Sequence, residues 1–155
     1  MPKSFRLKLS LLALAGAVCT GALALEPEPG VVSTELLKST TAWDGLPIVY
    51  PAGPAQLSVQ RINLAAGART GWHEAAVPAV IYVLEGGVEF RRRDGQRLQV
   101  QAGHAVAVPA RELHDARPTG GKPAQMLIIY AGAEGQKTGV ALPDFEGGGA
   151  TRIGN

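Results

Sequence analysis

The chain has 155 residues, of which 46% are hydrophobic and 18% charged, and this length corresponds to one domain. Its formal net charge of +2 becomes −1 without residues 1–24, which carry three of the 15 basic residues and none of the 13 acidic ones. The remaining chain therefore offers no basic surface that would indicate a nucleic acid or an anionic membrane as its partner.

Residues 1–24 have the pattern of a signal peptide. Three basic residues come first, about ten apolar residues follow, and the small residues Ala22 and Ala24 form a cleavage site. The apolar run is shorter than the roughly 20 residues that span a bilayer. Cys19 leaves a lipoprotein signal open, and an uncleaved anchor is the other alternative. The sequence predicts an exported protein, periplasmic or secreted, that has no membrane association after cleavage.

The first elements after the cleavage site are an arm and a long strand. Residues 25–32 contain closely spaced prolines and predict an extended arm, because proline disfavours a helix. A strand is predicted from Gln56 to Leu64. Its apolar side chains change from odd to even positions along the strand, which predicts a bulge or a bend.

Further short strands follow at close intervals. Two are predicted within residues 80–92, on either side of Glu85-Gly-Gly87, and Asp94-Gly95 predicts a hairpin turn. Three more are predicted at residues 98–100, 105–108 and 125–131. Short strands without helical periodicity predict an all-β fold, a single-domain antiparallel barrel or jelly roll over residues 33–142. The glycine-rich residues 143–155 predict a flexible tail.

Two segments run from a glycine to a histidine and carry the candidate chemistry. The first runs from Gly67 to His73, and the second runs from Gly103 to His114. A barrel can point the two imidazoles at each other from either side of a cavity, and imidazole is a common ligand of transition metals. Alternate residues of a strand face the same way, so a His-x-His pair would supply two ligands. Here Ala75 occupies the second position.

These segments resemble the two motifs of the cupin family, G-x5-H-x-H-x3/4-E-x6-G and G-x5-P-x-G-x2-H-x3-N. The matching residues are Gly67, His73 and Gly86 in the first motif and Gly103, Pro109 and His114 in the second. The resemblance covers about residues 33–140 and implies a small exported cupin with a single barrel. Cupins of this kind commonly dimerise through edge strands, so the resemblance also implies a homodimer.

Several positions depart from the cupin motifs. The differing residues are Ala75 at the second histidine, Ala79 or Val80 at the acidic ligand, Arg111 at a glycine and Pro118 at an asparagine. Of the three histidines and one glutamate that the resemblance implies, only His73 and His114 remain. The metal site is therefore predicted to be degenerate, with at most a weakly bound divalent transition metal.

Nearby acidic residues are poor replacements for the missing ligands. Glu74 alternates to the face opposite His73, and Glu85 lies at the turn that ends a strand. Glu112 is the least unfavourable candidate, because its loop could fold inward.

The sequence predicts a cupin-domain protein that binds a small molecule in its barrel. His73, His114, Trp72 and Tyr82 are expected to line the cavity. The alternative is a metal-dependent enzyme of the dioxygenase or isomerase type that uses His73 and His114 as a reduced ligand set. A structural protein whose cavity is packed shut is a third possibility. No substrate class is indicated, because the strands are mainly aliphatic and carry no cluster of like charges.

Overall fold

A computed structural model describes residues 29–141 of the protein. The expected signal peptide, most of the expected arm and the glycine-rich tail lie outside the described residues. The chain divides into two units, and the unit that begins at Thr34 contains all of the described strands. Residues 29–141 contain no helix that is long and apolar enough to span a membrane.

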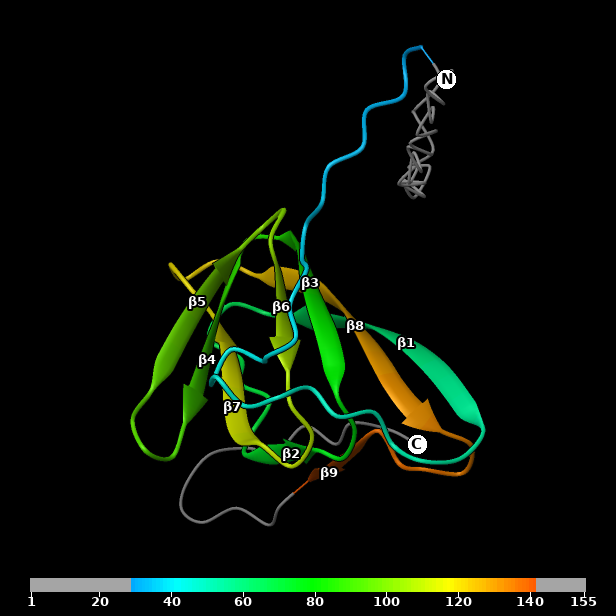
Figure 1. Ribbon diagram of the computed structural model, residues 1–155. Coiled ribbons are helices and arrows are strands. Elements are labelled where there is room, and N and C mark those ends of the chain that lie inside the picture. The colour runs from blue at the N-terminus through cyan, green and yellow to red at the C-terminus, as the bar shows by residue number, and fades with distance from the viewer. Residues whose placement is uncertain (1–28, 142–155) are drawn as a thin grey trace, which may run out of the picture. The chain divides into compact units, whose positions relative to one another are not determined.

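The strands form two antiparallel sheets, so the predicted all-β fold is confirmed (Figure 1). The strands are β1 (Ala55–Leu64), β2 (His73–Ala75), β3 (Ala79–Glu85), β4 (Gly87–Arg92), β5 (Arg97–Gln101), β6 (Ala105–Val108), β7 (Leu113–Pro118), β8 (Ala124–Ala133) and β9 (Gly139–Ala141). One sheet has the order β1-β8-β3-β6, and the other has the order β5-β4-β7-β2-β9. Apart from the hairpin of β4 and β5, neighbouring strands in both sheets come from distant parts of the sequence.

The hydrophobic core lies between the two sheets. Ile81, Val83 and Met126 contribute from the four-stranded sheet, and Val88 and Phe90 contribute from the five-stranded sheet. None of these five side chains is more than 3% exposed. Burial of a side chain of this size stabilises a fold by about 1.5–3 kcal/mol, so this layer holds the two sheets together.

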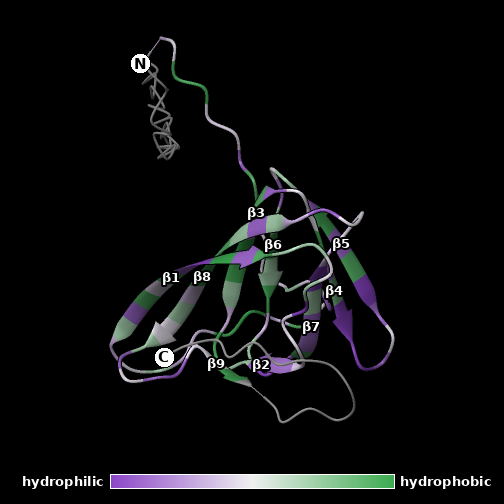
Figure 2. Ribbon diagram, turned by 180° about the vertical axis from the view of Figure 1, so that it is seen from behind, coloured by the Kyte–Doolittle hydropathy of each residue, from purple (hydrophilic) through white to green (hydrophobic). Residues whose placement is uncertain are grey.

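The predicted bulge in β1 is wrong. β1 pairs with β8 in unbroken register over its whole length. Hydrophilic and hydrophobic residues alternate along it on either side of Gln60-Arg61 (Figure 2). Leu57 and Val59 lie on the outer face, where they are 73% and 62% exposed. The change of parity therefore arises because Leu57 and Val59 are apolar residues on the surface, and it does not mark a bulge. The register shift of this sheet lies in β3, between Val83 and Glu85.

Arg111 adopts a backbone conformation that is unusual for its residue type. It has a φ of 63°, and every other positive φ recorded within residues 29–141 belongs to a glycine. The second cupin motif has a glycine at this position. The left-handed conformation costs an L-residue about 1–2 kcal/mol. The amide of Arg111 donates to the carbonyl oxygen of Ala75 at 2.5 Å, which helps to hold the turn in place.

Substitution of Arg111 by glycine is expected to stabilise the protein. Relief of the left-handed conformation should raise the free energy of unfolding by about 0.5–1 kcal/mol, after the greater chain entropy of glycine in the unfolded state is included. Urea unfolding of the variant measures the change. Arg111→Ala is the matched control, because it removes the guanidinium and keeps the Cβ atom. An equal gain in both variants would assign the effect to the lost charge.

Candidate functional site

His73 and His114 are direct partners on neighbouring strands. His73 begins β2 and lies opposite His114 in β7. Their ring centroids are 4.4 Å apart, and the ring planes make an angle of 61°. The two imidazoles therefore come together as expected, but they lie side by side on one sheet and not on opposite sides of a cavity.

Both rings line a cavity of about 530 Å³. Much of its wall is apolar and comes from Ile62, Ile81, Phe90, Met126 and Ile128. Polar side chains, including Tyr130 and Gln60, lie in the same lining. Among residues 29–141, Lys137 is the only charged residue in it. A mostly apolar cavity of this size with a few polar groups is typical of a site for a small molecule.

Backbone carbonyl groups fix the tautomer of both rings. Nδ1 of His73 lies 2.9 Å from the carbonyl oxygen of Gly71, and Nδ1 of His114 lies 3.2 Å from that of Glu112. A carbonyl oxygen only accepts hydrogen bonds, so each Nδ1 must carry the proton. In the neutral ring, Nε2 then keeps its lone pair. Metal-binding histidines commonly make this kind of bond with their second nitrogen.

His114 is neutral at physiological pH. Burial of the ring lowers the pKa of His114 to about 4, and the neighbouring His73 lowers it as well. The hydrogen bond to the carbonyl oxygen of Glu112 acts in the opposite direction. The neutral ring thus presents an acceptor nitrogen. This neutral form, and not the cation, binds a metal or a hydrogen-bond donor.

The described side chains supply only part of a metal site. Two imidazoles have the correct tautomer, but the motif positions of further ligands hold Ala75 and Ala79, which are 5% and 6% exposed and belong to the core. Within residues 29–141, no group of three or more His, Cys, Asp or Glu residues gathers. A stable transition-metal site usually needs three or four protein ligands. The donor set of the described residues does not fit such a site.

Glu112 does not direct its carboxylate at the imidazoles. The carboxylate accepts a hydrogen bond of 2.7 Å from Nε1 of Trp43 and lies 3.5 Å from Nε of Arg92. With Asp44, it lines a separate depression of about 320 Å³. Burial raises the pKa of Glu112 to about 7, although the bond from Trp43 lowers it. Glu112 is therefore not the replacement ligand, and it contributes to the site through its backbone carbonyl.

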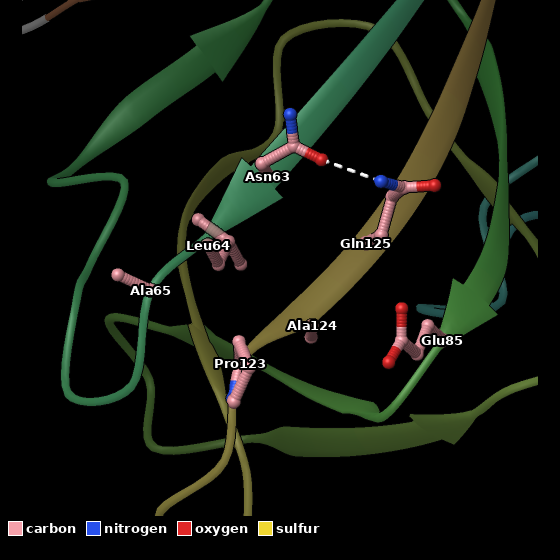
Figure 3. A pocket seen from close by; sticks show the side chains of 7 residues that line it. All are labelled: Asn63, Leu64, Ala65, Glu85, Pro123, Ala124 and Gln125. Carbon is pink, nitrogen blue, oxygen red and sulfur yellow. Dashed lines mark hydrogen bonds between the residues drawn. The ribbon is translucent and has the colours of Figure 1, made fainter.

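Glu85 also lies away from the imidazoles. Figure 3 shows its side chain at the end of β3, in a depression of about 290 Å³ beside the ends of β1 and β8. In the same depression, Nε2 of Gln125 donates to Oδ1 of Asn63 at 2.7 Å. No residue that lines this depression also lines the cavity with the two histidines.

Trp72 and Tyr82, which were expected to flank the histidines, do not line their cavity. Trp72 lines a separate depression of about 380 Å³, and the guanidinium carbons of Arg91 and Arg93 lie 5.8 and 5.7 Å from its ring. Tyr82 alternates with the buried Ile81, so it lies on the other face of the sheet. Proximity in sequence to a motif did not predict the direction of either side chain.

The sequence did not indicate the other polar residues of the cavity. Ser58 and Gln60 lie on the inward face of β1, and Tyr130 lies on β8. Burial raises the pKa of Tyr130, so its hydroxyl group remains a hydrogen-bond donor. Ser58 and Gln60 occupy alternate positions of β1, and this spacing could have predicted that both face the cavity. The wrongly predicted bulge obscured it.

Comparison with known proteins identifies the domain type. The family model described as a cupin domain matches residues 60–130, which contain both histidines. No curated protein matches the sequence.

Several solved structures have a similar fold. A cupin-like protein from Thermotoga maritima has a TM-score of 0.50 at 19% identity, covering 56% of this chain and 64% of that chain. The DMSP lyase DddQ from Ruegeria pomeroyi has a TM-score of 0.49 at 21% identity, covering 55% and 42%. Oxalate decarboxylase from Bacillus subtilis, which has Mn(II) centres, has a TM-score of 0.48 at 21% identity, covering 56% and 24%. The chain spans less than half the length of the lyase and of the decarboxylase.

Proposed function

The chain belongs to the cupin superfamily, and on that premise we propose that it is an exported protein that binds a small molecule between its sheets. The observation that supports the proposal is the cavity of about 530 Å³, in which two imidazoles with fixed tautomers meet an apolar wall. The apolar wall favours the body of a ligand, and the imidazoles orient its polar end. Export rests on the signal-peptide pattern of residues 1–24.

A screen of small molecules by thermal unfolding tests this proposal. The mature chain should show at least one ligand that raises Tm by roughly 5–10 °C at 100 times its Kd, which corresponds to about 2.7 kcal/mol. The shift should be the same with and without EDTA. A Tm that falls when EDTA is added to the free protein would contradict a binding function that needs no metal.

A metal-dependent enzyme of the dioxygenase or isomerase type is the second candidate function. The observation that favours it is the bond from each Nδ1 to a backbone carbonyl, because metal-binding histidines commonly show this arrangement. His73 and His114 would then bind the ion weakly, since further protein ligands are needed for high affinity. Elemental analysis of protein purified from its native compartment tests this function. Less than about a tenth of a metal ion per chain, without rescue by added Fe, Mn, Ni or Zn, would exclude it.

The outer face of the four-stranded sheet supports a homodimer. Within residues 29–141, β1 forms one edge of this sheet and pairs only with β8. On its outer face, Leu57 and Val59 are strongly exposed, and Ile129 lies opposite Val59 in β8. An open edge strand beside exposed apolar residues is a site of pairing between chains. We propose a second copy of this chain as the occupant, because antiparallel pairing of β1 with itself satisfies two-fold symmetry.

Substitution of Val59 by lysine is expected to give a monomer. The charge would lie in the apolar centre of the proposed interface, where it would lose its hydration without gaining a partner. Sedimentation velocity of the wild type and the variant at about 50 µM measures the change. Arg61→Ala is the control on the same face of β1 and should remain dimeric. A wild-type protein that sediments as a monomer would contradict the proposed dimer.

A further inference from the structure

The two imidazoles of the cavity present a pair of hydrogen-bond acceptors. Each Nδ1 donates to a backbone carbonyl, so the lone pair of each Nε2 remains available. The rings are cross-strand partners with centroids 4.4 Å apart, and His73 and His114 therefore offer these lone pairs from adjacent positions. Two acceptors cannot bond to each other. Each of them needs a donor from elsewhere.

The described protein does not supply those donors. Thr70 lies in the same lining, but its hydroxyl accepts a bond of 2.8 Å from the amide of Ala116 and donates to the carbonyl oxygen of Gly71 at 3.1 Å. The ring of Phe90, which is 6.2 Å from His114 between centroids, carries no hydrogen-bond donor. Within residues 29–141, neither Nε2 accepts a hydrogen bond. A ligand that displaces water from this part of the cavity must therefore donate to both nitrogens or leave buried acceptors unpaired.

The charges around the cavity restrict the kind of donor. An ammonium group would be stabilised by a nearby carboxylate, but no Asp or Glu belongs to the described lining. Lys137, the one charged residue among the described residues of the lining, repels a cation. Ethers, ketones and carboxylates present only lone pairs toward the imidazoles. A neutral hydroxyl group satisfies both conditions, because it donates without carrying charge.

We propose that the cavity binds a neutral molecule with two adjacent hydroxyl groups on an apolar skeleton, one hydroxyl donating to Nε2 of His73 and the other to Nε2 of His114. The inference rests on the proposed binding function and specifies the chemical class of the ligand. The apolar wall formed by Ile81, Phe90 and Met126 accommodates the carbon skeleton. Tyr130 and Gln60 provide further polar contacts for substituents that lie away from the diol.

A matched series of cyclohexane derivatives tests the proposal. The probes are cis-cyclohexane-1,2-diol, cis-cyclohexane-1,4-diol, cyclohexanol and 1,2-dimethoxycyclohexane, each titrated into the mature chain in EDTA and followed by NMR of the two histidine rings. The 1,2-diol is expected to bind about fivefold more tightly than cyclohexanol, because it makes one additional neutral hydrogen bond. It should also bind more tightly than the 1,4-diol, and the dimethoxy compound should bind most weakly.

Two variants connect this preference to the imidazoles. His73→Phe removes one acceptor and keeps an aromatic ring. The fivefold preference should then be lost, so that the 1,2-diol and cyclohexanol bind with about equal affinity. Retained binding of cyclohexanol by His73→Phe shows that the cavity is intact. Tyr82→Phe is the matched control, since it removes a polar group from an aromatic residue that does not line the cavity, and it should keep the wild-type preference.

Other outcomes overturn the inference in distinguishable ways. If cyclohexanol or the dimethoxy compound binds as tightly as the 1,2-diol, paired donation is wrong while the proposed binding function stands. If the 1,2-diol binds only when a metal ion replaces EDTA, direct donation to the imidazoles is wrong. If no member of the series binds, the diol class is wrong, and the broader screen with and without EDTA decides the proposed function separately.

Discussion

Substitution of Asp115 by alanine is expected to lower the free energy of unfolding by about 3 kcal/mol. The side chain of Asp115 is 1% exposed, and its Oδ2 atom lies 2.8 Å from Nη2 of Arg69 and 2.5 Å from Nη2 of Arg91. Removal of the carboxylate leaves the partly buried guanidinium of Arg91 without its anion. An uncompensated charge at such a site costs more than the pair itself contributes, which is the reason for the large effect.

Asp94→Ala is the matched control for this prediction. Asp94 also lies near a guanidinium, at 3.4 Å from Nη2 of Arg92, but its side chain is 56% exposed. An exposed pair of this kind contributes less than about 1 kcal/mol. Urea unfolding of both variants near pH 7 gives the comparison. If Asp115→Ala costs no more than Asp94→Ala, the buried network around Asp115 does not stabilise the sheet.

The second large effect is expected from Glu112→Gln, and it should depend on pH. Burial raises the pKa of Glu112 from 4.5 to about 7 in the folded protein, and this difference corresponds to about 3 kcal/mol. Because the folded pKa is the higher one, the stability from the neutral carboxyl group is fully present below pH 4.5. It is lost as the pH rises to 7. Glutamine stays neutral and can still accept the hydrogen bond from Trp43.

Glu112→Gln should therefore be more stable than the wild type by about 2–3 kcal/mol near pH 8 and about equally stable near pH 4. Urea unfolding across this range measures both values. The pKa of His114 shifts in the opposite direction, from 6.5 to about 4, so its contribution is present above pH 6.5 and is lost toward pH 4. The variant should retain this loss of stability in acid. Equal stability of variant and wild type near pH 8 would contradict the shift at Glu112.

Local patterns of apolar residues predicted β1, β3, β4, β5, β6 and β8. Asp94-Gly95 does join β4 to β5, and Gly95 has the positive φ of 92° that such a turn requires. The patterns did not reveal β7, and they also missed β2 and β9, which have three residues each. A strand this short gains its structure from its neighbours in the sheet. Its own residues therefore contain little of the information that determines it.

The two histidines of the candidate site were predictable in identity but not in geometry. The motif positions indicated His73 and His114, and both line the cavity. Their side-by-side arrangement follows from the pairing of β2 with β7, which no spacing within the sequence specifies. The direction of Tyr82 depends on strand parity within β3, and Trp72 directly precedes the short strand β2. A shift by one residue reverses which face of the sheet a side chain occupies, so such predictions fail easily.

The position of β9 at the edge of its sheet affects how quickly a molecule can enter or leave the cavity. Among the described strands, β9 pairs only with β2, and Gly139 and Val140 belong to both β9 and the cavity lining. Short edge strands open at a lower free energy than the centre of a sheet. The wall beside the imidazoles is thus its least protected part, and its amides should exchange hydrogen faster than those of β3. If the proposed binding function holds, transient opening of these three residues would determine the residence time of the bound molecule, while the rest of the barrel remains folded.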